Sequence, residues 1–193
     1  MIKVVAFNCS PRKDGNTAIL LKAALAELEA AGINTELIQL AGKPLRGCTA
    51  CMGCVKNKDR KCVLPDDGLN GYVQKMCEAD GMLIGSPTYF ADMTAEAKAL
   101  IDRAGYVGLA NGGLYRRKAG AAVAAVRRGG AVHVFDSINH FFTINQMVIP
   151  GASYWNFGIG REQGEVAGDA EGMRTMKVLG ENMAWLLARL NGK

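Results

Sequence analysis

The chain has 193 residues, 49% of them apolar and 21% charged, which is enough for one core without a disulfide or a metal to hold it together. The net charge of +5 is carried by short basic clusters without interleaved aromatic residues, which argues against nucleic-acid binding. No apolar run is long enough to span a membrane and the N-terminus lacks signal-peptide features, so we expect a cytoplasmic protein that makes no membrane contact.

Short apolar segments alternate with helical patterns along the chain. The expected strands occupy residues 2–7, 34–40, 81–84, 119–126 and 147–149, the last with a continuation near Tyr154. The expected helices are one that ends near Gly32 and then 66–77, 94–107, 132–144 and 176–190. This alternation predicts an α/β fold with a parallel sheet covered on both faces, in a single domain over residues 1–193.

The segment 41–65 breaks the alternation. It is rich in Gly, Cys, Lys and Arg and has no clear periodicity, so we expect a functional loop inserted into the domain. Cys48, Cys51, Cys54 and Cys62 lie in it with the spacing C-x2-C-x2-C-x7-C. Cytosolic thiols stay reduced, so clustered cysteines favour metal or redox chemistry over structural disulfides. The other two cysteines, Cys9 and Cys77, are expected to be small buried thiols.

A polar loop follows the first strand and leads into a helix. Ser10, Asn16 and Thr17 offer hydroxyl and amide donors, and Arg12 offers a guanidinium that suits a phosphate. The start of a helix also favours an anion. Neither G-x-G-x-x-G nor a P-loop motif is present, which disfavours a dinucleotide Rossmann site and a P-loop nucleotidase. The loop predicts phosphate binding, and the simpler alternative is that these polar residues only cap the helix.

Two further loops follow strands at the same edge of the expected sheet. Ligands of open parallel sheets bind outside the carboxyl ends of the strands. The loop after the third strand contains Tyr89 and Phe90, whose rings can cover a flat ligand or can instead pack on the following helix. The loop after the fourth strand spans 127–130.

Three motifs, in this order, carry a resemblance to a known family. They are Cys9-Ser10-Pro11-Arg12 with Gly15-Asn16-Thr17, then Gly85-Ser86-Pro87-Thr88-Tyr89-Phe90, and then Lys98 with Ile101-Asp102-Arg103. In them the chain resembles the NADPH-dependent FMN reductase branch of the flavodoxin-like superfamily. The resemblance implies a flavodoxin-like three-layer sandwich with a five-stranded parallel sheet of order 2-1-3-4-5. The implied FMN-binding residues are Ser10, Arg12, Asn16 and Thr17 for the phosphate, Pro87, Thr88, Tyr89 and Phe90 for the ring, and Arg127, Gly129 and Gly130 at its other edge.

The cysteine spacing also resembles that of the iron–sulfur flavoprotein subfamily. This resemblance implies a [4Fe-4S] cluster bound by Cys48, Cys51, Cys54 and Cys62 beside FMN, usually across a subunit interface, and hence a homodimer or homotetramer. The nearby basic residues would offset the charge of the cluster or dock an acidic donor such as ferredoxin, or they form only a solvated loop: Lys56, Lys58, Arg60 and Lys61. Zinc, free thiols and disulfides formed on oxidation are the alternatives for the cysteines.

These expectations lead to an FMN-dependent oxidoreductase whose chemistry belongs to the flavin, so no separate catalytic residue is expected. Electrons would pass from a donor such as ferredoxin through the cluster to FMN and then to oxygen, peroxide or a quinone. The first alternative is an NAD(P)H-dependent FMN or quinone reductase with unligated cysteines. The second is a non-catalytic, flavodoxin-like electron carrier. Asp102 and Arg103 are expected to form a structural pair.

Overall fold

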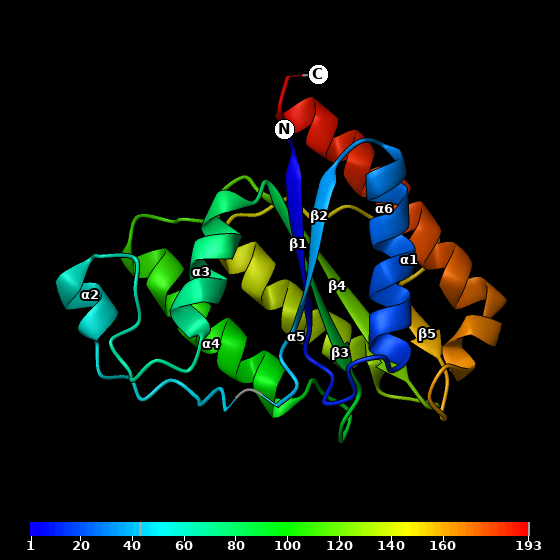
Figure 1. The fold of residues 1–193 in the computed structure, drawn as a ribbon, viewed down its shortest axis with the longest axis horizontal. Coiled ribbons are helices and arrows are strands. Elements are labelled where there is room, and N and C mark those ends of the chain that lie inside the picture. Colours follow the sequence, from blue (N-terminus) through cyan, green and yellow to red (C-terminus); the bar gives the residue numbers. More distant parts are fainter. Residues whose placement is uncertain (43, 193) are drawn as a thin grey trace.

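The computed structural model describes residues 1–42 and 44–192 and has a five-stranded parallel sheet at its centre (Figure 1). The strands are β1 (Lys3–Asn8), β2 (Asn34–Gln39), β3 (Gly81–Pro87), β4 (Ala119–Val126) and β5 (Phe157–Ile159). Their order is β2-β1-β3-β4-β5, which confirms the predicted flavodoxin-like topology. All residues of β4 are buried, as expected for a strand with helices on both faces.

Helices cover both faces of the sheet (Figure 1). One face packs against α1 (Asn16–Ala30) and α6 (Ala170–Leu190), and the other against α3 (Leu69–Glu78), α4 (Ala95–Ala110) and α5 (Ala131–Ile144). A 3-10 helix, η1 (Glu165–Gly168), precedes α6. The two faces bury separate apolar clusters. Within the two described ranges, no helix combines the length and the apolar character needed to cross a membrane.

The last strand of the sheet lies farther along the chain than predicted. The strand expected over 147–149 is wrong, because Val148 forms only an isolated bridge with Ala119. The sheet instead continues at β5, where Phe157 pairs with Ala124. Pro150 follows the bridge and has no N–H group to donate to a ladder, which explains why the strand does not continue there.

The cysteine-rich segment predicted as a loop over 41–65 is described except at position 43. It contains one short helix that the sequence did not predict, α2 (Gly53–Asn57), which packs against α4 at the edge of the molecule (Figure 1). Several non-glycine residues beside the cysteines have left-handed backbone conformations: Ala50 (φ 52°), Met52 (φ 59°), Lys58 (φ 51°) and Arg60 (φ 63°). Such conformations are uncommon for these residues and often occur at binding sites.

Candidate functional site

The carboxyl ends of the strands surround a polar pocket of about 180 Å³. Most of the residues predicted to bind FMN line it: Ser10, Arg12, Asn16, Thr17, Pro87, Thr88, Tyr89 and Arg127. Gly160 and Arg161 line it too, from the segment after β5, and the sequence analysis missed both. The rule that ligands bind beyond strand ends would have found them if the last strand had been placed correctly.

The loop after β1 is shaped by its own hydrogen bonds. The Asn8 side chain donates to the Lys13 carbonyl (3.1 Å) and accepts from the Ser10 N–H (3.2 Å). The Ser10 hydroxyl oxygen in turn accepts from the Arg12 N–H (3.1 Å). The loop is therefore curled without help from a ligand, and the exposed side chain of Arg12 lines the pocket.

Asn16 has a structural role in this pocket. Its amide group donates to the carbonyls of Gly160 (3.0 Å) and Glu162 (3.0 Å), and its oxygen accepts from the Gly164 N–H (2.9 Å). Both amide donors are therefore used within the chain. Asn16 fixes the segment after β5 against the start of α1, and the donors free for a phosphate there are backbone N–H groups.

The start of α1 has no side-chain cap in the part of the chain that the structure describes. Its N-cap residue is Gly15, and no side chain accepts a hydrogen bond from the first turn. The alternative in which Ser10, Asn16 and Thr17 only cap the helix is therefore not supported. An uncapped helix start leaves N–H groups and a partial positive charge for an anion.

Two buried hydroxyl groups in the pocket have no partner among the described residues. They are the Oγ1 atoms of Thr17 and Thr88. A buried polar atom without a hydrogen bond is uncommon in a native structure, because it loses its contact with water and gains nothing in return. Both atoms are available to a polar ligand, and a flavin mononucleotide carries a phosphate and a polar ring that suit them.

Three predicted residues lie outside the pocket lining. Phe90 is fully exposed in a left-handed conformation (φ 48°), so it does not pack on the following helix. Tyr89 is half-exposed and lines the pocket. Gly130 has a left-handed conformation (φ 91°), and a Cβ atom there would lie 2.9 Å from the Ala91 Cα atom. The glycine therefore lets the loop after β4 approach the loop after β3. A Cβ atom on Gly129 would meet open space.

A second, narrow cavity brings the four clustered cysteines together. Cys48, Cys51, Cys54 and Cys62 line this cavity of about 20 Å³, and Arg103 and Tyr106 line it from α4. Cys48 and Cys51 are exposed, while Cys54 and Cys62 are partly buried. Across residues 1–42 and 44–192, no three His, Cys, Asp or Glu side chains are arranged to hold one metal ion.

Hydrogen-bond donors point at two of the four sulfur atoms. They are the Ala50 N–H at 3.4 Å from Cys48 Sγ and Arg103 Nη2 at 3.5 Å from Cys62 Sγ. The Gly53 N–H, helped by the Thr49 side chain, lowers the pKa of Cys51. Burial raises the pKa of Cys54, and the nearby Cys62 and Cys48 raise it further. Donors directed at sulfur favour thiolates, the form in which cysteine binds metals.

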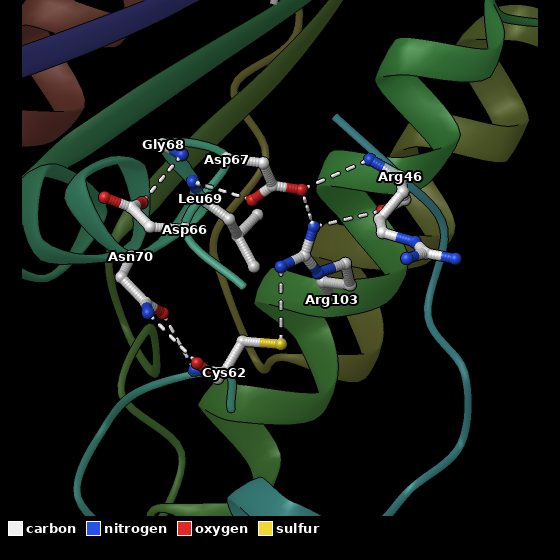
Figure 2. Close-up of polar contacts among 8 residues, drawn as sticks. All are labelled: Arg46, Cys62, Asp66, Asp67, Gly68, Leu69, Asn70 and Arg103. Carbon is white, nitrogen blue, oxygen red and sulfur yellow. Dashed lines mark hydrogen bonds and ion pairs between the residues drawn. The ribbon is translucent and has the colours of Figure 1, made fainter. Parts of the chain in front are cut away.

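Arg103 forms no pair with Asp102. The guanidinium of Arg103 binds the Asp67 carboxylate, and Asp102 pairs with Lys98 (2.5 Å) one helical turn away. The expected pair is wrong because adjacent residues of a helix point in different directions. Figure 2 shows the Arg103 guanidinium between Asp67 and Cys62, with Arg46 on the same side of it as Asp67.

Comparison with known proteins decides the family. A family model described as NADPH-dependent FMN reductase matches residues 2–162. The chain belongs to the NADPH-dependent FMN reductase family. The protein is therefore a flavoprotein oxidoreductase, and the predicted cofactor FMN is supported by the family.

Two curated relatives match nearly the whole chain. An iron–sulfur flavoprotein of Methanocaldococcus jannaschii is 37% identical over 190 residues, which cover 95% of this chain and 96% of the relative. An iron–sulfur flavoprotein of Methanosarcina thermophila is 30% identical over 177 residues, which cover 91% of this chain and 90% of the relative.

Solved structures show the same fold. RosB with bound 8-demethyl-8-formylriboflavin-5'-phosphate superposes with a TM-score of 0.77 at 17% identity, covering 100% of this chain and 81% of RosB. A WrbA-like flavodoxin from Agrobacterium tumefaciens superposes with a TM-score of 0.67 at 13% identity, covering 97% of both chains. The fold of this FMN reductase family member is therefore flavodoxin-like, as predicted.

Proposed function

We propose that this FMN reductase family member is an iron–sulfur flavoprotein, which passes electrons from a donor such as ferredoxin through a [4Fe-4S] cluster to FMN and on to an acceptor. The observation that carries the proposal is the single cavity lined by Cys48, Cys51, Cys54 and Cys62. The names of the two archaeal relatives, which align along nearly the whole chain, support it. We place the protein in the reducing cytoplasm, where such thiols persist.

Four cysteine thiolates match the ligand set of a [4Fe-4S] cluster. Cys48, Cys51, Cys54 and Cys62 would each hold one iron atom of such a cluster. The cavity is narrow, and its exposed side is formed by Cys48 and Cys51, so binding requires the loop to widen toward solvent. When bound, the cluster would supply single-electron transfer and FMN would supply the exchange between single electrons and electron pairs.

Each polar group of the FMN pocket would contact a different part of the cofactor. Arg12 and the uncapped N–H groups at the start of α1 would bind the phosphate. The hydroxyls of Thr17 and Thr88 would gain their missing partners. Tyr89 would lie against the ring, and Arg127 and Arg161 would offer positive charge from the loops after β4 and β5.

Helix α4 connects the FMN pocket with the cysteine cavity. At its start, the Thr94 hydroxyl donates to the Cys9 carbonyl (2.9 Å) and the Thr94 N–H donates to the Ser86 hydroxyl (3.0 Å), which fixes the helix to the ends of β1 and β3. Arg103 lies nine residues along this helix, about 13 Å by helical rise, and lines the cysteine cavity. One rigid element therefore links the two proposed redox sites.

We also propose that two copies of this chain associate. A groove of about 540 Å³ runs between α4 and α5, and its exposed apolar walls include Tyr106, Leu109 and Ile144. Tyr106 also lines the cysteine cavity, so a second copy seated in the groove would cover the cysteine loop as well. Light scattering should give a dimer or a tetramer for the wild type and a smaller species for I144E, whereas a monomeric wild type contradicts this proposal.

Anaerobic isolation tests the proposed function. The wild type should contain about four iron and four sulfide per chain, with broad visible absorbance that chelation removes. Cys62→Ser should lose the iron and keep FMN. Cys77→Ser is the matched control, because this cysteine does not line the cavity, and it should retain the iron. Iron-free wild type with only flavin absorbance contradicts the proposal.

Donor specificity separates the remaining candidates. Reduction of bound FMN by ferredoxin and not by NADPH supports the proposed electron path. Rapid bleaching of FMN by NADPH in iron-free protein favours the NAD(P)H-dependent reductase with unligated cysteines. Reduction without turnover of oxygen, peroxide or a quinone favours the electron carrier.

A further inference from the structure

Arg103 is a buried cation beside the cysteine cavity. Only 2% of the residue is exposed, and it is among the largest fully buried side chains of the described residues. Removing a guanidinium from water costs free energy that only good partners can offset. The partners of Arg103 therefore indicate what its burial is for.

The guanidinium divides its donors between a carboxylate and a sulfur. Nη1 donates to the Asp67 carboxylate and to the Arg46 carbonyl (3.1 Å), while Nη2 donates to Cys62 Sγ (3.5 Å), as Figure 2 shows. An arginine usually presents both arms of its fork to one carboxylate. Here Asp67 takes one arm, and its other oxygen accepts from the Leu69 N–H (3.4 Å) instead.

The second arm suits a charged sulfur better than a neutral thiol. A neutral thiol is a weak acceptor, whereas a hydrogen bond to an ionised partner is shorter and stronger. Asp67 holds the guanidinium in place from the side opposite the sulfur, and the Arg46 carbonyl fixes the same arm. The arrangement directs one buried N–H group and one buried positive charge at Cys62.

We propose that Arg103, held by Asp67, is a positioning residue that orients Cys62 and raises the reduction potential of the cluster bound there. The inference rests on the proposed function. Reduction by one electron adds one negative charge to the cluster without making or breaking a bond to the protein. A buried N–H donor and positive charge stabilise the reduced form more than the oxidised form, which raises the potential. The exposed cations of the loop, such as Lys61, act through water and are screened.

Redox titration of the iron-loaded wild type against dithionite, followed by visible absorbance and electron paramagnetic resonance, tests this inference. In Arg103→Met the midpoint potential of the cluster should shift to a more negative value. In Arg103→Lys, which keeps the charge and loses the fork, the shift should be smaller. In Asp67→Asn, which leaves the positive charge of Arg103 uncompensated, the shift should have the opposite sign. A merely structural role would loosen the cysteine loop in Arg103→Met and in Asp67→Asn alike. The shifts of the midpoint potential in these two variants would then have the same sign.

Lys61→Gln is the matched control, because it removes one exposed charge next to Cys62 and should leave the potential near that of the wild type. If Arg103→Met does not fold or load iron, Arg103→Lys carries the test. An unchanged potential in the Arg103 variants, in wild-type protein that does contain iron and sulfide, overturns the inference and leaves the proposed function intact. Wild-type protein without iron overturns both.

Discussion

Thr17 and Thr88 line the same polar pocket, and the hydroxyl oxygen of each is buried without a hydrogen-bond partner in the described part of the chain. Thr17 lies in the first turn of α1 and Thr88 directly follows β3, and the pairing of β1 with β3 brings these two segments together. A pocket with two unsatisfied hydroxyls is built for a polar ligand, because the ligand recovers the hydrogen bonds that burial took from water.

Replacement of these two hydroxyl groups should weaken FMN binding without lowering the stability of the fold. Thr17→Val and Thr88→Val should each weaken FMN binding about 5-fold, the cost of one hydrogen bond. The FMN-free variants should be as stable as the wild type or more stable, since an unsatisfied polar group is removed. Fluorescence titration and urea unfolding measure the two effects. Thr94→Val is the control: its hydroxyl donates to Cys9 and accepts from the Ala97 N–H, so it should lose about 1 kcal/mol of stability. Equal destabilisation of all three variants contradicts the prediction.

Arg12 should recognise the phosphate of FMN and not its ring. Arg12→Gln should weaken FMN binding about 10-fold or more, because it removes a charge-assisted hydrogen bond. Riboflavin lacks the phosphate, so its affinity should be nearly the same for the variant and the wild type. Lys13→Gln is the matched control, since this neighbouring exposed side chain does not line the pocket. Equal losses for FMN and riboflavin would place Arg12 at the ring instead.

Gly53 should be required for the shape of the cysteine loop. A Cβ atom at Gly53 would lie 2.4 Å from Val63 Cγ2, so Gly53→Ala must push apart the two segments that carry Cys54 and Cys62. We expect the iron content of Gly53→Ala to fall well below that of the wild type, with FMN retained. Val63→Ala in the same chain should restore the iron, because it removes both clashing methyl groups. Gly47→Ala is the control within the loop, since a Cβ atom there meets open space. Full iron content in Gly53→Ala contradicts the prediction.

The Asp67–Arg103 pair should make stability depend on acid pH. Burial of Asp67 opposes its ionisation, but the hydrogen bond from Arg103 and the N–H of Arg46 outweigh this effect and lower its pKa. A lowered pKa contributes stability above the unfolded value of about 3.9, and this is lost as the pH falls through the folded value. Asp67→Asn should therefore cost about 3 kcal/mol near pH 7, with the difference from the wild type shrinking below about pH 4.

Urea unfolding at a series of pH values measures this difference. Asp66→Asn is the control, because the exposed Asp66 accepts a hydrogen bond from the nearby Gly68 N–H and should matter far less. A difference for Asp67→Asn that does not change with pH contradicts the prediction.

Asn16 should stabilise the fold through the segment after β5. Asn16→Ala removes three hydrogen bonds of 3.0 Å or less, to Gly160, Glu162 and Gly164, and should cost about 2 kcal/mol of unfolding free energy in the FMN-free protein. Asn182→Ala is the control, since Asn182 makes one exposed hydrogen bond to Gly151. Equal stability of Asn16→Ala and the wild type, measured by urea unfolding, would contradict this structural role.

Local patterns predicted most elements of the fold. The strand 119–126 has the bounds expected from its run of small apolar residues. The helix expected from residue 66 begins instead at Leu69. The carboxylates of Asp66 and Asp67 accept hydrogen bonds from the N–H groups of Gly68 and Leu69, and Asp67 also binds Arg103, so both aspartates precede the helix. The strand β5 was misplaced because its three residues carry little periodicity and its position is set by pairing with β4.

The sequence by itself determined the α/β class, the polar loops at the strand ends and the clustered cysteines, because these depend on residues close together in the chain. The resemblance to the FMN reductases added the strand order and FMN. Only the tertiary structure decided that Arg161 enters the polar pocket at the strand ends and that Arg103 faces Asp67 and Cys62. Each of these contacts joins segments far apart in the sequence, and no local pattern encodes which side chains the packed helices and strands bring together.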